Sequence, residues 1–133
     1  MSRFILMVLA VAAIAMPTSA QTVPGPLVLE TLSTAFVAPN DFDFLADGRM
    51  LVAQRTGAIR VRTPAGVVGT VGTQGGVSTS SEEGLLSVVR HPNFATNGYI
   101  YVWYARGSNM TLTRWTCTGD LNNSSSTNLS MTD

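Results

Sequence analysis

Short runs of apolar and β-branched residues, separated by glycine, proline and asparagine, dominate the chain after residue 38. The run Ala58–Thr63 is the clearest, because Ile59 and Val61 alternate with Arg60 and Arg62. Successive side chains of a strand point to opposite faces, so this run predicts a strand with one buried and one wet face. Comparable strands are expected at 42–45, 49–54 and 67–71.

Turn signals separate these runs. Asp47-Gly48 is a hairpin signal, since both residues tolerate the dihedral angles of tight turns. Two further turns are expected at 55–57 and 64–66, both of which end in glycine, and a bend is expected at 38–41. The four strands should therefore form one antiparallel meander.

A second meander is expected after a polar, glycine-rich loop over residues 72–81. Leu85–Arg90 is a nearly continuous apolar run and Tyr99–Ala105 is aromatic and β-branched, so both predict strands. The loop between them contains Pro92 and Gly98, which break the pattern. A turn then leads into a third strand, Met110–Cys117.

Two meanders without an amphipathic helix to cover them predict an all-β fold built as a sandwich, barrel or propeller. An extended leader and a first strand, Leu27–Leu32, are expected within residues 21–38. At about 40 to 45 residues per four-stranded blade, the stretch from Leu27 to Cys117 has room for roughly two propeller blades. We therefore predict a partial β-propeller over residues 39–118.

Both ends of the chain depart from this pattern. Residues 1–20 combine Arg3, an apolar run from Phe4 to Met16 and small residues before Ala20, which is the organisation of a signal peptide cleaved after Ala20. The run is short for a membrane span, so an uncleaved anchor is the weaker alternative, and the protein is expected to be secreted or periplasmic. Residues 119–133 are polar and are expected to be disordered.

Composition excludes some partners. The formal net charge is zero and the arginines are dispersed. Because a polyanion partner requires clustered basic residues, nucleic acid is not expected to bind. Cys117 is the only cysteine, and no basic or histidine neighbour in the sequence would lower its pKa, so we interpret it as structural.

The stretch from Glu82 to Tyr104 carries a family resemblance. It reads Glu-Glu-Gly-Leu-Leu, a few apolar residues, His-Pro-Asn-Phe, Asn-Gly and Tyr-Ile-Tyr. This order is similar to the early signature of the glucose/sorbosone dehydrogenase family, secreted sugar oxidoreductases that use pyrroloquinoline quinone (PQQ). The resemblance covers Pro39 to Thr118 and implies the first blades of a six-bladed propeller.

The resemblance implies a substrate-binding role for Glu82, which stands two residues before the motif glycine. A carboxylate can accept hydrogen bonds from two sugar hydroxyls. In the family, the catalytic histidine and the basic residues that hold PQQ lie in later segments, so no catalytic or PQQ-binding residue is expected in this chain. The chain thus resembles the N-terminal fragment of an enzyme that oxidises an aldose to its lactone and passes electrons to an external acceptor. We expect it to be inactive alone.

Other candidate residues favour structure over chemistry. His91 lacks an acidic partner at motif spacing and is interpreted as a loop anchor rather than a base. Asp41, Asp43 and Asp47 do not keep the spacing of a calcium loop, so no metal is expected here, although calcium is compatible with a full-length family member.

The aromatic residues leave a second function open. Tyr99, Tyr101 and Trp103 could stack on a sugar or a quinone, but they share one strand face, which favours packing in the core or between blades. The alternative to the enzyme is a non-enzymatic secreted β-module that binds carbohydrate or protein, or a remnant without function. An open propeller fragment leaves two sheet faces uncovered, so self-association is also expected.

Overall fold

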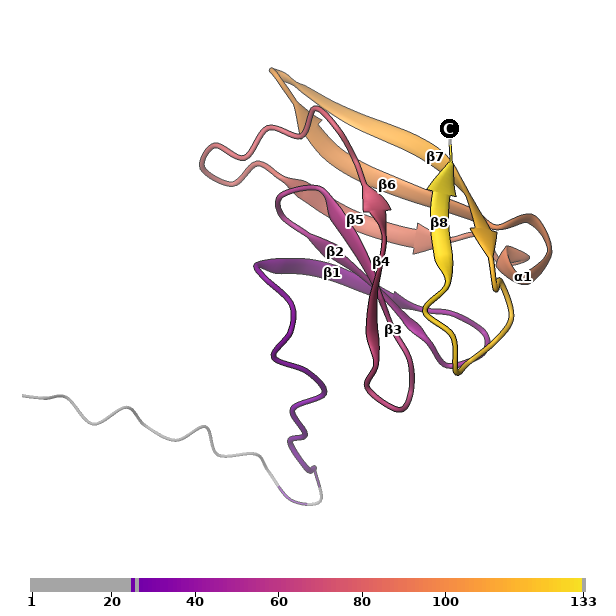
Figure 1. The fold of residues 1–133 in the computed structure, drawn as a ribbon. Helices are drawn as coiled ribbons and strands as arrows, with labels where there is room; N and C mark the ends of the chain where they lie inside the picture. Colours follow the sequence, from indigo (N-terminus) through magenta and orange to yellow (C-terminus); the bar gives the residue numbers. More distant parts are fainter. Residues whose placement is uncertain (1–24, 26, 133) are drawn as a thin grey trace, which may run out of the picture. The chain divides into compact units, whose positions relative to one another are not determined.

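The computed structural model describes residue 25 and residues 27–132, and the predicted all-β class is confirmed there. In chain order the elements are β1 (Pro39–Phe44), β2 (Met50–Gln54), β3 (Ala58–Arg62), β4 (Val68–Thr73), β5 (Leu85–Arg90), α1 (Phe94–Asn97), β6 (Tyr99–Arg106), β7 (Asn109–Gly119) and β8 (Leu129–Thr132). They form two four-stranded antiparallel sheets, sheet 1 (β1 to β4) and sheet 2 (β5 to β8), in which consecutive strands pair (Figure 1). The predicted signal peptide lies outside the described residues. Among the helices that the structure describes, none is long and apolar enough to cross a membrane.

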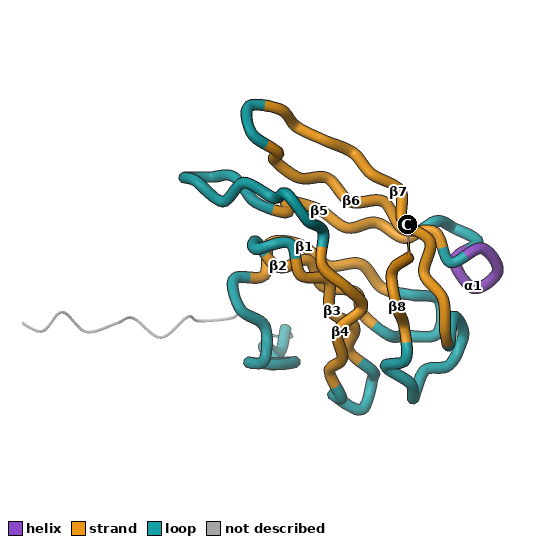
Figure 2. The backbone as a smooth tube through the Cα atoms, turned by 45° about the horizontal axis from the view of Figure 1, so that its top comes forward, coloured by secondary structure: helices purple, strands orange, loops and turns teal. Residues whose placement is uncertain are grey.

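Both sheets belong to the compact unit that starts at Thr31, and they bury a common core. The first strands, β1 and β5, lie against each other, as do the last strands, β4 and β8. In β3 the side chains of Ile59 and Val61 are buried and those of the two arginines are half-buried, which confirms the predicted alternation. Figure 2 shows α1 at one end of sheet 2 and the β6–β7 hairpin at the other. We call the facing surfaces of the sheets the inner faces and the opposite surfaces the outer faces.

A buried arginine links the two sheets. Arg49 follows the Asp47-Gly48 turn, is fully buried and forms an ion pair with Asp47 at 2.7 Å. Its guanidinium also donates to the carbonyl oxygens of Asp120 at 2.7 Å and Ser126 at 3.0 Å. Because buried charge is costly unless it is fully paired, this arrangement fixes the connection between β7 and β8 on sheet 1.

The predicted disorder of residues 119–133 is wrong for the part that the structure describes. Leu129–Thr132 forms β8, the fourth strand of sheet 2, and Leu129 is only 2% exposed. The connection approaches β4 closely, because a Cβ atom added at Gly69 would lie 2.6 Å from Thr127. Pairing with β7 and burial against sheet 1 stabilise a strand too short to give a pattern of its own.

The N-terminal boundary also differs from the prediction. The structure has no strand over Leu27–Leu32, where strand-forming side chains find no neighbouring strand to pair with in the described residues. The bend lies at Val37 and Ala38, the second of which has a φ of 46°, and β1 begins at Pro39, inside the predicted bend. Proline is tolerated as the first residue of an edge strand because its missing N–H is not needed there.

Candidate functional site

The loop that joins the two sheets carries Glu82, and the side chain of Arg55 holds this loop. Arg55 lies in the turn between β2 and β3, and its Nε donates to the carbonyl oxygen of Glu83 at 3.0 Å. Its Nη2 donates to the carbonyl oxygens of Thr79, at 2.6 Å, and Ser81. One planar guanidinium therefore connects three backbone carbonyls on both sides of Glu82.

The motif glycine is explained by the same arginine. Gly84 has a φ of 153°, and a Cβ atom added there would lie 2.7 Å from Arg55 Cγ and 3.0 Å from the Arg55 carbonyl oxygen. That carbonyl oxygen also accepts a hydrogen bond from the Leu85 N–H at 3.0 Å. Only glycine lets the loop lie this close to Arg55 as it enters β5.

Glu82 itself is exposed, whereas Glu83 is half-buried. Within residues 27–132 the Glu82 carboxylate has no hydrogen-bond or ion-pair partner, so its oxygens are open to hydroxyl donors. The surrounding backbone is ordered by Arg55 and by a hydrogen bond from the Glu83 N–H to the Ser80 carbonyl at 2.9 Å. The substrate-binding role of Glu82 stays a prediction, and the arrangement is chemically compatible with it.

His91 lies at the other end of β5 from Glu82. The six-residue strand β5 between them is roughly 20 Å long at about 3.3 Å per residue. The Nδ1 atom of His91 accepts a hydrogen bond from the Asn93 N–H at 3.0 Å and contacts the Asn97 side-chain amide at 2.9 Å. The prediction that His91 anchors its loop is confirmed. The loop also contains the one-turn helix α1, which the sequence did not indicate, and Gly98 ends it in the left-handed region with a φ of 66°.

Asp41 and Asp43 protect an edge of sheet 2. The Asp41 carboxylate accepts hydrogen bonds from the Ser87 hydroxyl at 2.7 Å and the Val88 N–H at 3.1 Å. Asp43 accepts one from the Arg90 N–H at 2.9 Å. These donors belong to β5, an edge strand whose free N–H groups would otherwise be open to pairing. Among the residues from Leu27 to Thr132, no cluster of histidine, cysteine and acidic side chains is arranged to hold a metal ion.

Cys117 is buried in the core of sheet 2. Burial raises the pKa of its thiol from 9.0 to about 12, because the thiolate would lose its hydration. The thiol is therefore kept in its unreactive form at neutral pH, in agreement with a structural role.

The aromatic residues of β6 share one face, as predicted, but it is not the core face. Tyr99, Tyr101 and Trp103 lie on the outer face of sheet 2, and Trp103 is 41% exposed. The core side of β6 is formed instead by the aliphatic side chains between them and by Tyr104. The guanidinium of Arg114 lies 4.5 Å above the ring of Tyr99. The side chains of Tyr99, Tyr101 and Trp103 therefore do not pack in the core between the two sheets.

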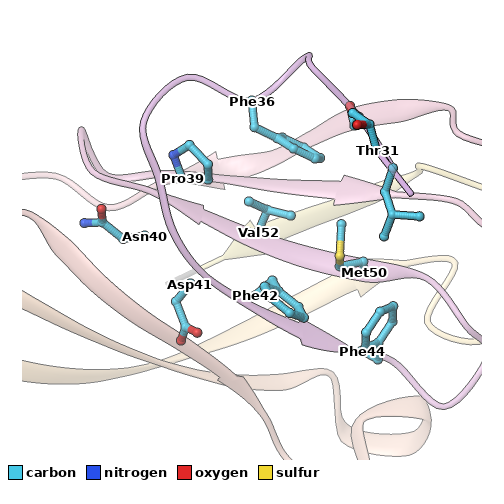
Figure 3. Close-up of a pocket in the computed structure, with 11 residues that line it drawn as sticks. Thr31, Phe36, Pro39, Asn40, Asp41, Phe42, Phe44, Met50 and Val52 are labelled. Atoms are coloured by element: carbon cyan, nitrogen blue, oxygen red, sulfur yellow. The ribbon is translucent and has the colours of Figure 1, made fainter. Parts of the chain in front are cut away.

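A pocket of about 760 Å³ lies on the outer face of sheet 1. Figure 3 shows Phe36 reaching over the sheet from the preceding segment, with Phe42 and Phe44 of β1 on the same side as Met50 and Val52 of β2. Its remaining lining residues are Thr31, Leu32, Ser33, Pro39, Asn40 and Asp41. Sequence analysis missed this pocket, although Phe42 and Phe44 alternate with the two aspartates of β1.

The described residues do not fit a PQQ site. PQQ carries three carboxylates, which require cationic or amide donors that converge on one cavity. The pocket on sheet 1 has no basic residue in its lining. Elsewhere the guanidinium groups of Arg49, Arg55 and Arg60 are bound to backbone carbonyls at separate places. These arginines therefore do not converge on one site for the three carboxylates.

Comparison with known proteins agrees with this architecture. The glucose / sorbosone dehydrogenase family matches residues 36–132. No curated protein matches the chain in sequence. The two four-stranded antiparallel sheets match part of the fold of β-propeller-containing dehydrogenases. The chain belongs to the glucose/sorbosone dehydrogenase family.

Solved structures give the same picture. The PQQ-bound aldose sugar dehydrogenase from Streptomyces coelicolor is 28% identical with a TM-score of 0.65, and the match covers 69% of this chain and 28% of that one. An oxidoreductase (glucose dehydrogenase) from Thermus thermophilus is 29% identical with a TM-score of 0.61, over 68% of this chain and 28% of that one. A further glucose dehydrogenase, 19% identical with a TM-score of 0.63 over 77% of this chain and 33% of that one, shares the fold. The chain thus spans less than a third of the length of the first two structures.

Proposed function

We propose that this chain supplies the first two blades of an exported, PQQ-dependent sugar dehydrogenase that oxidises an aldose to its lactone. The observation that carries the proposal is the family match over residues 36–132, together with the likeness to a PQQ-bound aldose sugar dehydrogenase. The oxidation removes two electrons and two protons from the sugar, and the electrons pass to an external acceptor. The signal-peptide pattern of residues 1–20 supports export to the periplasm or the medium.

Glu82 is the residue that we assign to the sugar. It is exposed, it is flanked by backbone that Arg55 orders, and its carboxylate can accept hydrogen bonds from two neighbouring hydroxyls. Such a contact positions the substrate and does not itself transfer a proton or a hydride. Loss of Glu82 should therefore affect sugar affinity more than the rate of the chemical step.

The chain alone is proposed to be inactive. Its single histidine, His91, is engaged in its own loop, and the lining of the pocket on sheet 1 has no basic residue to bind the carboxylates of PQQ. We expect no reduction of a redox dye when the chain is mixed with PQQ and D-glucose. The Streptomyces coelicolor enzyme under the same conditions is the positive control, and turnover by this chain above the protein-free blank would contradict the proposal.

A chimera tests the part that this chain contributes. Residues 36–132 would replace the matched segment of the Streptomyces coelicolor enzyme, and dye reduction with aldoses would be measured. In an active chimera, Glu82→Gln should raise KM for the aldose by about tenfold, the equivalent of one charged hydrogen bond, with a smaller change in kcat. Glu83→Gln is the matched control, since that side chain is half-buried. Equal effects of the two substitutions would remove the special role of Glu82.

A further inference from the structure

We propose that Arg55 is a positioning residue for Glu82, which fixes the conformation of the loop and thereby sets the affinity of Glu82 for aldose hydroxyls. The inference rests on the proposed sugar-binding function of Glu82. Arg55 would act without touching the sugar, because its guanidinium is occupied by the carbonyl oxygens of Thr79, Ser81 and Glu83. We call these contacts of Arg55 with residues 79–84 the Arg55 clasp.

The loop needs such a constraint at the residue next to Glu82. Ser81 has a φ of 49°, in the left-handed region that residues with a side chain rarely adopt. The carbonyl group of this same residue accepts a hydrogen bond from Arg55 Nη2. The clasp therefore stabilises an unfavourable backbone conformation at the position that determines where the Glu82 side chain points.

The clasp is also specific to arginine. Three carbonyls are reached from one planar group, two of them by the same Nη2 atom and the third by Nε. A lysine ammonium is a compact charge at the end of a flexible chain and cannot reproduce this fork. The loop backbone also lies close to the Arg55 side chain at Gly84, where an added Cβ atom would be 2.7 Å from Arg55 Cγ. The loop is thus fixed both by hydrogen bonds and by contact.

Hydrogen exchange of the full chain with Arg55→Lys tests the clasp. The Glu83 N–H, which donates to the Ser80 carbonyl, and the Leu85 N–H, which donates to the Arg55 carbonyl, report on loop opening. We expect their exchange to accelerate by about tenfold or more, as loss of charge-assisted hydrogen bonds requires. Arg60→Lys is the matched control, because Arg60 Nε donates to the Gly69 carbonyl on β4 and not to the loop. Unchanged exchange in Arg55→Lys would overturn the inference.

Titration with D-glucose, followed by NMR at the Glu82 amide, then distinguishes a role of Arg55 in positioning Glu82 from a role in the stability of the chain alone. The apparent Kd for glucose should rise by about tenfold in Arg55→Lys, whereas thermal unfolding should stay close to that of Arg60→Lys. Gly84→Ala, which keeps the charge of Arg55 but pushes the loop away from it, should give the same rise. If Arg55 acted through its charge alone, Gly84→Ala would not change the apparent Kd for glucose. That result would overturn the inference.

The sugar-binding role of Glu82 and the positioning role of Arg55 are refuted by different results. If glucose does not shift Glu82 in the unsubstituted chain, or shifts it equally in Glu82→Gln, the sugar-binding role fails and the inference fails with it. If glucose binds the unsubstituted chain through Glu82 but binds Arg55→Lys equally well, only the role of Arg55 is refuted.

Discussion

The Cys117 thiol should be nearly unreactive in the folded chain. It is 2% exposed, and burial raises its pKa from 9.0 to about 12. Because the thiolate is the nucleophile, this shift lowers the reactive fraction at mildly alkaline pH by about three orders of magnitude. We expect an aromatic disulfide reagent to react at least about a hundredfold more slowly with the native chain than with the chain in guanidinium chloride, as measured by absorbance.

The same shift in pKa gives a pH dependence with a defined sign. Below the unfolded pKa of 9.0 both states keep the thiol protonated, and the stabilising effect is complete. Between 9.0 and about 12 only the unfolded chain loses the proton, so the free energy of unfolding falls by about 1.4 kcal/mol per pH unit. Cys117→Ala should remove this slope.

Equally fast labelling of the native and denatured chains by the aromatic disulfide reagent would contradict the buried position of Cys117.

Single residues of the candidate site were predictable only where a local motif carried them. Glu82 and the motif glycine stand together in the sequence, so the family resemblance could indicate them. Arg55 lies in the turn between β2 and β3, distant from Glu82 in the sequence, and contacts backbone carbonyls, which every residue has, so its role leaves no pattern in the sequence. The exposed state of Glu82 and the constraint on its loop became visible only in three dimensions.

Among the contacts between elements, those of Arg49 should contribute most to the free energy of unfolding. It is fully buried, and removal of its side chain leaves the Asp47 carboxylate without its cationic partner and the carbonyls of Asp120 and Ser126 without their donor. We expect Arg49→Met to reduce the free energy of unfolding by about 3 to 5 kcal/mol, since breaking a buried pair strands a charge. Urea denaturation followed by circular dichroism provides the measurement.

Two further variants serve as controls for this experiment. Arg60→Met removes one half-buried hydrogen bond to Gly69 and should cost only about 1 kcal/mol. Asp47→Asn combined with Arg49→Met should restore part of the loss, because the stranded carboxylate is then neutral. If Arg49→Met were as mild as Arg60→Met, the link between β7–β8 and sheet 1 would not contribute to stability.

Strands were predictable where turn chemistry and alternation agreed. The Asp47-Gly48 hairpin and the alternation of β3 both follow from local rules, and both are confirmed. The strand β8 was missed because it is four residues long and its ordering comes from β7 and from β4, whose sequences lie elsewhere. For the same reason, the strand-forming residues over Leu27–Leu32 were misleading, since a strand needs a partner as well as propensity. The outer position of Tyr99, Tyr101 and Trp103 also depends on which face meets the other sheet.

Taken together, residues 31–132 have an apolar core between the sheets and apolar side chains on both outer faces. On sheet 1 these are Phe42, which is 58% exposed, and Phe44. On sheet 2 they are Val89, Trp103, Met110 and Leu112, the last of which is 61% exposed. Exposed apolar patches of this kind favour association. We therefore propose that the chain self-associates in solution.

Sedimentation velocity over a range of concentrations tests this proposal. The sample should begin at Gln21, so that the apolar run from Phe4 to Met16 does not itself cause association. The average mass is expected to rise with concentration, and Phe42→Glu or Leu112→Glu should lower it. Ala65→Glu, in an exposed turn away from both faces, is the control. A monodisperse monomer of the unsubstituted chain would refute self-association.

The two glutamate substitutions also distinguish how copies meet. Within the chain, sheet 1 stacks on sheet 2 with first strand on first strand and last strand on last strand, so a second copy can continue the stack by placing its sheet 1 on the outer face of sheet 2. Every contact of such a head-to-tail assembly needs both outer faces, and either substitution alone should give monomers. If each face paired with its own kind, one substitution would leave dimers and only the double substitution would give monomers. A head-to-tail assembly that closes into a ring should sediment as one discrete mass, whereas an open stack should give a broad distribution that shifts with concentration.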